Sequence, residues 1–160
     1  MGKKKGPAKR LPIFAAADKG DVAAVRTILE EHPTTISAKN NDGWTPLHQA
    51  SFSGNLSVVK LLLEKGADIS AGCKDQDTPL HYAAAQGHCR IMRFLAAKGA
   101  DLRVKDRDGE APLDVIPKKE KDARKLMAAL LAGEDCPEVG SEEDDWETDP
   151  EEGESGSAAA

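Results

Sequence analysis

The chain has 160 residues, of which 39% are hydrophobic, and it carries 22 basic and 28 acidic side chains for a net charge of −6. No stretch is long and apolar enough to span a membrane or to act as a signal peptide, so the composition argues against membrane and secreted proteins. The three cysteines are scattered without a Cys-x-x-Cys pair, which argues against a disulfide framework and favours a reducing compartment, the cytoplasm or the nucleus.

Charge divides the chain into three segments. Residues 134–160 hold 12 of the 28 acidic residues and none of the 22 basic ones, so residues 1–133 carry 16 acidic and 22 basic residues, a net of +6. Residues 1–9 are basic, with four lysines. Neither terminal segment can bury enough apolar surface to offset the entropy lost on ordering. We therefore predict disorder in residues 1–9 and 134–160, and one folded domain over residues 10–133.

Within that domain a heptapeptide recurs every 33 residues. Asp-Gly-Trp-Thr-Pro-Leu-His at 42–48 returns as Asp-Gln-Asp-Thr-Pro-Leu-His at 75–81 and, more divergent, as Asp-Gly-Glu-Ala-Pro-Leu-Asp at 108–114. A fixed period of this length indicates a stack of identical supersecondary units, none of which can bury its apolar face alone.

The first unit, residues 10–41, is divergent. Leu-Pro-Ile-Phe at 11–14 occupies the Thr-Pro-Leu-His positions if one residue is inserted in the loop that follows this unit. Residues 25–29 then match the second helix of the next unit. We predict a helix pair here, with a polar outer face as expected of an end unit.

The second and third units, residues 42–74 and 75–107, follow the pattern most closely. Thr before Pro predicts the start of a short first helix, because Thr is an N-cap residue and Pro suits the first turn. Gly66 and Gly99 are expected to end the second helices in a left-handed conformation. One apolar face of each second helix is formed by Leu56, Val59, Leu62 and Leu63, then by Ile91, Phe94 and Leu95.

The fourth unit, residues 108–133, keeps the spacing but not the motif. A charged link at 118–121 precedes an apolar segment at 123–131, which predicts one more helix.

These four units resemble the ankyrin repeat family. The resemblance implies an all-α solenoid of helix–turn–helix units with β-hairpin-like turns, and a function in protein–protein binding. It also implies that Thr and His of Thr-Pro-Leu-His hold the turn to neighbouring units, so His48 and His81 are interpreted as structural. Partners of this family dock on the hairpin tips and on the concave face of the first helices. The matching positions are Asn41, Asp42, Trp44, Gln49, Phe52, Lys74, Asp75, Asp77, Tyr82, Gln86, Arg107, Asp108 and Glu110.

Aromatic residues stand out among these positions, because Trp and Tyr are favoured anchors in interfaces. Trp44 and Phe52 are therefore candidate anchors together with Tyr82. The alternative is that Trp44 packs on the next turn and Phe52 on the adjacent unit.

One position departs from the repeat in a way that has an energetic consequence. Gln76 stands where Gly43 and Gly109 occupy a turn that usually needs positive φ. A side chain in that conformation costs roughly 1 kcal/mol.

The sequence predicts neither enzyme activity nor a cofactor or metal site. No Cys or His cluster has the spacing of metal ligands, and no Gly-rich phosphate loop or Ser-His-Asp arrangement is present. His88 precedes Cys89, but adjacent residues of a helix do not face each other, which argues against a Cys–His nucleophile.

The leading hypothesis is a monomeric intracellular adaptor or inhibitor that binds another protein through its concave surface. The alternative is a chaperone-like protein whose acidic tail shields a basic client such as a histone or ribosomal protein, with Trp146 as an apolar anchor. The tail has two further interpretations, as a solubilising segment or as a segment that folds back on the basic body. Ser141 and Thr148 resemble sites of acidophilic kinases, and phosphorylation would add negative charge.

The basic residues 3–10 have three interpretations, a nuclear import signal, a nucleic-acid contact or a solvated end of the chain. The absence of interleaved aromatic residues argues against nucleic-acid binding.

Overall fold

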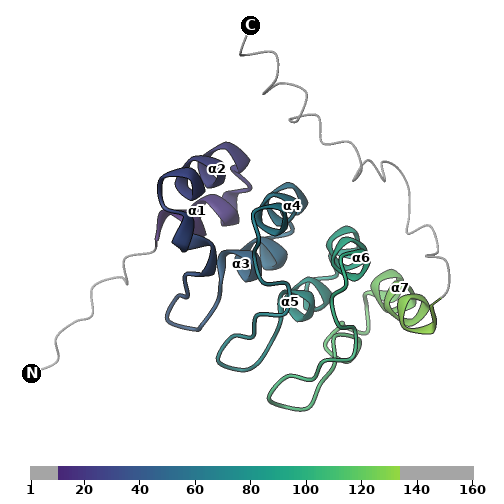
Figure 1. The fold of residues 1–160 in the computed structure, drawn as a ribbon. Coiled ribbons are helices and arrows are strands. Elements are labelled where there is room, and N and C mark those ends of the chain that lie inside the picture. Colours follow the sequence, from purple (N-terminus) through teal and green to yellow (C-terminus); the bar gives the residue numbers. More distant parts are fainter. Residues whose placement is uncertain (1–10, 134–160) are drawn as a thin grey trace, which may run out of the picture.

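The computed structural model describes residues 11–133, which form a row of helix pairs with hairpin-like loops along one edge (Figure 1). The predictions for residues 1–9 and 134–160 concern segments outside the described residues. The helices are α1 (Pro12–Lys19), α2 (Val22–Glu31), the 3-10 helix η1 (Pro33–Ser37), α3 (Pro46–Ser53), α4 (Leu56–Glu64), α5 (Pro79–Ala85), α6 (Cys89–Ala97) and α7 (Lys121–Ala132).

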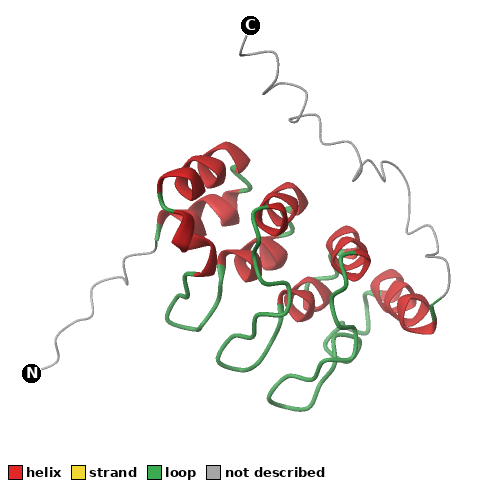
Figure 2. Ribbon diagram, in the orientation of Figure 1, coloured by secondary structure: helices red, strands yellow, loops and turns green. Residues whose placement is uncertain are grey.

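The helices form two layers. The first helices of the units, α1, α3 and α5, pack on one another in sequence order and form the inner layer, while α2, α4, α6 and α7 form the outer layer. The loops project beyond the inner layer, on the side away from the outer layer (Figure 2). Within residues 11–133 no segment is a strand, in agreement with the predicted all-α solenoid.

The Thr-Pro pairs start the inner helices as the sequence predicts. Thr45 is the N-cap of α3 and Pro46 its first residue, and Thr45 and His48 form a reciprocal capping box. Thr78 and His81 do the same for α5. Each box satisfies two of the backbone N–H groups that a helix start leaves without partners, which lets helices this short hold their first turn.

The outer helices bury a wider face than the sequence suggests. In α4 the buried residues are Val58, Val59, Leu61 and Leu62, whereas Leu56 and Leu63 are only half-buried and pack at the edge of the core. The predicted face was therefore wrong in part. The reason is that α4 lies against three helices, α2, α3 and α6, so the buried arc exceeds a single helical stripe. In α6 the predicted residues are buried together with Met92.

The fourth unit lacks its first helix. Residues 111–116 form turns instead, and only α7 follows. Pro117 explains the difference, because it falls inside the segment that would continue such a helix and would there remove a hydrogen bond and clash with the preceding turn. Asp114 replaces the motif histidine, and its Oδ2 accepts a 3.0 Å hydrogen bond from the backbone of Ala111.

The histidines of the motif connect consecutive units. His48 Nε2 lies 3.0 Å from the carbonyl oxygen of Asp77 in the next hairpin, and His81 Nε2 lies 3.1 Å from that of Glu110. Because Nδ1 of each ring accepts the backbone N–H of its own capping Thr, Nε2 carries the proton and donates. The implied structural role of both histidines is confirmed.

A second set of bridges runs in the opposite direction along the stack. Asn55, at the start of α4, donates through Nδ2 to the carbonyl oxygens of Ala17 and Asp18, at 2.7 and 2.8 Å. His88, 33 residues later, lies 3.0 Å from the carbonyl oxygen of Phe52 through Nε2. Each residue thereby satisfies the end of the preceding inner helix. The approach needs a residue without Cβ at Gly54, where a Cβ would come within 2.7 Å of the His88 ring.

The hairpin of the third unit departs from its neighbours. Asn40 Oδ1 accepts backbone N–H groups of Asp42 and Trp44, and Asp106 Oδ1 does the same in the fourth unit. Cys73 occupies the equivalent position and cannot form this pair of bonds. Gln76, three residues later, has φ 66°, so the expected left-handed conformation is confirmed there.

Replacing Gln76 by Gly should therefore stabilise the domain. Removal of the strained Cβ gains about 1 kcal/mol, partly offset by the greater freedom of Gly in the unfolded chain. This corresponds to a rise of a few degrees in Tm. Thermal unfolding of Gln76→Gly and of the control Gln76→Ala, which keeps a Cβ, measures the effect. An unchanged or lower Tm for Gln76→Gly would contradict it.

The buried imidazole of His48 should make stability fall in mild acid. Burial is the main reason that its pKa drops from 6.5 to about 4. Between these values the unfolded chain binds a proton and the folded chain does not, so stability is fully present above pH 6.5 and decreases as the pH falls toward 4. The loss attributable to His48 is about 3 kcal/mol.

Denaturant unfolding at several pH values between 4 and 7 tests this dependence. His48→Asn should be less stable at pH 7, because cross-unit and capping bonds are lost, but its stability should change less between pH 6.5 and 4. His32→Asn, at an exposed position, is the matched control. Equal pH dependence in wild type and His48→Asn would rule out this origin.

Candidate protein-binding surface

Three aromatic side chains from different elements meet where the hairpins join the inner layer. Trp44 comes from the hairpin of the second unit, Phe52 from the end of α3, and Tyr82 from α5. The ring centroid of Trp44 lies 4.4 Å from that of Tyr82 and 5.4 Å from that of Phe52, with tilted planes. The Phe52 and Tyr82 centroids are 6.3 Å apart. We refer to these three residues as the aromatic cluster.

The cluster is only partly covered. Trp44 and Tyr82 are half-buried, whereas 38% of Phe52 is exposed. Among the large hydrophobic residues of the described chain, only Leu11 is exposed to a similar extent. The two sequence interpretations are therefore compatible, because Trp44 packs on Tyr82 of the next unit while the cluster also presents an apolar surface to solvent.

The Tyr82 hydroxyl fixes the cluster to the hairpin of the third unit, residues 72–77. It donates to Asp77 Oδ2 at 3.4 Å and lies 3.4 Å from Cys73 Sγ. Burial raises the pKa of Tyr82 well above its usual range and also raises the pKa of the Asp77 carboxyl. The hydroxyl therefore keeps its proton at physiological pH and remains a donor.

Most of the predicted hairpin-tip positions face solvent. In the described chain the exposed ones are Asn41, Asp42, Lys74, Asp75, Arg107, Asp108 and Glu110, together with Gln86 at the end of α5, while Asp77 is half-buried. The tips are joined by backbone hydrogen bonds from Lys74 to Asp42 and from Arg107 to Asp75, so they form one continuous edge. This edge borders the aromatic cluster.

Gln49 is the predicted site residue that the structure places elsewhere. It is only 5% exposed, and its Nε2 donates to Asp18 Oδ1 at 2.9 Å and to Ser53 Oγ at 3.2 Å. Ser53 donates to the same carboxylate oxygen at 2.6 Å. Gln49 therefore joins the second unit to α1, and its side chain is buried between them. The sequence did not predict this contact, because Asp18 lies in the divergent first unit, where the repeat pattern indicates no partner for the amide.

Two ankyrin repeat models match the chain, one described as three copies over residues 2–73 and one as many copies over residues 62–116. Together they span most of the sequence. The chain belongs to the ankyrin repeat family.

Individual relatives each match about a third of the chain or slightly more. The chain is 54% identical over 56 residues to serine/threonine-protein kinase VIK of Arabidopsis thaliana, covering 35% of this chain and 13% of the relative. It is 39% identical over 56 residues to ankyrin repeat domain-containing protein 49 of Homo sapiens, covering 35% and 23%. It is 37% identical over 60 residues to 26S proteasome non-ATPase regulatory subunit 10 of Dictyostelium discoideum, covering 38% and 26%. The chain thus matches about a quarter or less of each of these relatives.

Ankyrin repeats generally mediate protein–protein interaction, and the proteins that carry them differ in their other activities. The described residues 11–133 include no helix with the length and apolarity needed to cross a membrane. The aromatic cluster and the hairpin edge together form the candidate protein-binding surface of these repeats.

The ankyrin fold also brings together ligand-type side chains that sequence spacing did not reveal. Ligand atoms of Asp77, His81 and Asp106 lie within 4.8 Å of one another, as do those of Cys73, Asp75 and Asp77. Both His81 nitrogens, however, are engaged by Thr78 and Glu110, so the imidazole has no free lone pair. In this arrangement His81 is not available as a metal ligand.

His88 and Cys89 do not form a nucleophilic pair. The His88 imidazole is directed to the carbonyl oxygen of Phe52, and burial raises the pKa of the Cys89 thiol, which disfavours the reactive thiolate.

Within the aromatic cluster, the more exposed ring should contribute less to the stability of the domain. Trp44→Ala should cost about 2 kcal/mol, because a half-buried ring loses contacts with two others. Phe52→Ala should cost less than about 1 kcal/mol, since much of the ring is already in solvent. Urea unfolding of both variants measures the difference. Equal losses would mean that Phe52 is mainly a packing residue.

Proposed function

We propose that this ankyrin repeat protein is an intracellular adaptor or inhibitor that binds another protein through the aromatic cluster and the adjoining hairpin edge. The observation that carries the proposal is the exposed ring of Phe52, supported from behind by Trp44 and Tyr82. A solvent-facing aromatic group on a packed aromatic base gains buried area on docking and loses little side-chain entropy.

The rigidity of the scaffold supports the same proposal. Cross-unit hydrogen bonds of His48 and His81 hold the hairpins in register, and backbone bonds connect the tips. A partner therefore meets a preformed surface and pays little ordering cost on the side of this chain.

Two departures from the repeat pattern lie in the hairpin that contacts the Tyr82 hydroxyl, and they support a functional origin of this surface. Cys73 replaces the turn-forming Asn or Asp of the neighbouring hairpins and contacts the Tyr82 hydroxyl. Gln76 holds a strained conformation in the same hairpin. Local rules are most often broken where function requires a particular surface.

The hairpin edge supplies the polar rim. It carries carboxylates at Asp42, Asp75, Asp108 and Glu110, interrupted by Lys74 and Arg107. Arg107 and Asp75 lie 3.8 Å apart as an exposed ion pair, which contributes little to stability but fixes the charge pattern that a partner encounters. We further propose that the protein is monomeric and acts in the cytoplasm or nucleus.

The second candidate is a chaperone-like function in which residues 134–160 shield a basic client. The observation that favours it is the concentration of 12 acidic residues, without a basic one, in that segment. The net negative hairpin edge is compatible with the same type of client.

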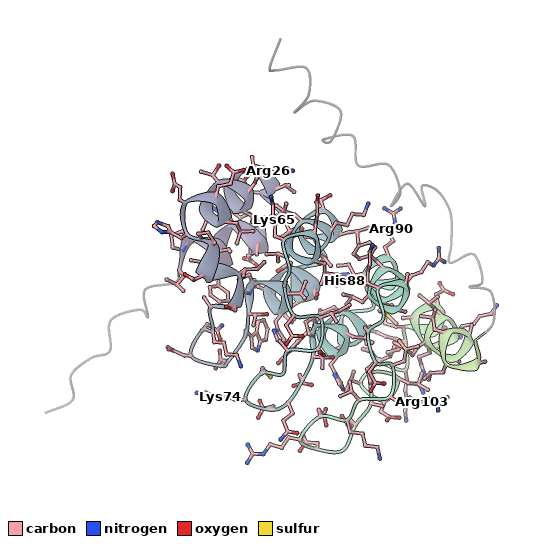
Figure 3. The ribbon with its side chains drawn as sticks, in the orientation of Figure 1. Arg26, Lys65, Lys74, His88, Arg90 and Arg103 are labelled. Carbon is pink, nitrogen blue, oxygen red and sulfur yellow. The ribbon has the colours of Figure 1, made fainter. Side chains whose placement is uncertain are left out.

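Affinity purification with the full chain and a Phe52→Ala variant tests the first candidate. Arg26→Ala is the control, since Arg26 lies on the outer layer far from the hairpins (Figure 3). A partner recovered with wild type and Arg26→Ala should be depleted with Phe52→Ala. Its Kd, measured with purified proteins, should rise at least tenfold.

The two candidates differ in their response to charge. A partner of the aromatic cluster should resist moderate salt and should bind unchanged when the acidic residues of 142–145 are replaced by their amides. A partner that keeps its affinity for Phe52→Ala, but dissociates in salt or with the amide variant, would exclude the first candidate and support the second.

A further inference from the structure

Charge is unequally distributed between the two sides of the stack. The hairpins at 39–44, 72–77 and 105–110 hold four basic and six acidic residues, a net of −2. By contrast, α6 with its C-cap Lys98 and α7 hold six basic residues and one acidic residue, a net of +5. Of these, Arg90, Lys98, Lys121, Lys125 and Asp122 are exposed, a net of +3, so the C-terminal part of the outer layer is the basic face of this domain.

Two of these cations have contacts that fix their position. Lys98 Nζ lies 5.5 Å from the centre of the Phe94 ring, and the Arg124 guanidinium donates to the carbonyl oxygen of Ile116 at 2.9 Å. Arg90 projects from α6 on the side away from the hairpins, whereas Lys74 lies on the middle hairpin (Figure 3). The basic face and the hairpin edge are thus separate surfaces.

The acidic segment begins beside this basic face. α7 ends at Ala132, and Gly133 follows as a left-handed cap with φ 71°. Arg103 donates through Nη2 to the carbonyl oxygen of Leu131 at 3.5 Å, which places a cation at the last turn of α7. The next 27 residues, 134–160, carry 12 carboxylates.

The length of this segment does not limit which surface of the domain it can contact. An extended chain of 27 residues spans up to about 90 Å, against about 18 Å for the length of α7. Charge distinguishes between the two surfaces, because the hairpin edge repels carboxylates and the basic face attracts them. At physiological ionic strength the Debye length is about 8 Å, so the attraction acts mainly in direct contact.

We propose that residues 134–160 dock in cis on the outer face of α6 and α7. The covalent connection at Gly133 keeps the local concentration of carboxylates high, which compensates for the weakness of each exposed ion pair. Docking there covers the basic face and leaves the aromatic cluster open. Phosphorylation of Ser141 or Thr148 strengthens the contact, since each phosphate adds charge and acceptor oxygens.

This contact is independent of the proposed protein-binding surface. It involves a different side of the domain, so its failure would not affect the role of Phe52, and the converse also holds. The occupant is this chain's own C-terminal segment; a second molecule's segment is the competing arrangement, and isotope mixing distinguishes the two.

Zero-length carbodiimide cross-linking of the native full chain tests the proposal, because it joins lysine amines only to carboxylates in contact. Three exposed lysines of the basic face, Lys98, Lys121 and Lys125, are matched by three exposed lysines of the hairpins, Lys39, Lys74 and Lys105. Mass spectrometry should find links from 134–160 to the first set at several-fold higher yield. Raising the salt from about 50 to 500 mM should lower that yield several-fold.

A charge-reversal pair separates attraction from simple proximity. Lys121→Glu with Lys125→Glu should lower the yield at Lys98 several-fold, whereas the control Lys39→Glu with Lys74→Glu should leave it unchanged. Equal yields at Lys98 and Lys105, or no links to either, would overturn the proposal. So would links that join labelled to unlabelled chains in an isotope mixture.

Discussion

The stack depends on a hydrogen bond between units, donated by a neutral imidazole to a backbone carbonyl of the next hairpin. Each of the two histidines uses one nitrogen to start its own helix and the other to hold the neighbouring turn. The arrangement works only while the ring is uncharged, because protonation of Nδ1 would point a donor at the N–H of the capping threonine. Helix initiation and repeat stacking are therefore a single structural event, which explains why Thr-Pro-Leu-His recurs as a unit and not as separate residues.

Much of this fold could be predicted from the sequence because the repeated motif marks where the helices begin and end. Thr before Pro starts an inner helix, Gly ends an outer one, and Gln76 adopts the left-handed conformation that its place in the period requires. The width of the buried face on α4 could not be predicted, since it depends on how many neighbours a helix has. The missing helix of the fourth unit had a visible signal, Pro117, which the regular spacing concealed.

The candidate site was predictable in position but not in detail. The family pattern indicates which residues reach the hairpin edge, and the structure brings Trp44, Phe52 and Tyr82 together. The Gln49 side chain, by contrast, is buried, and its amide donates to Asp18 of the first unit. That contact joins residues 31 positions apart, in units that do not share the motif. No period relates them, so only the packing of α1 on α3 reveals the pair.

The fourth unit ends the series of histidine bonds that connects the repeats. His48 and His81 each donate to the following hairpin, but Asp114 is an acceptor, and it turns back to the N–H of Ala111. The end of the stack thus offers no imidazole to the hairpin of another molecule. Asp114 lacks the imidazole N–H with which His48 and His81 hold the next hairpin, so the series of cross-unit histidine bonds ends at the third unit.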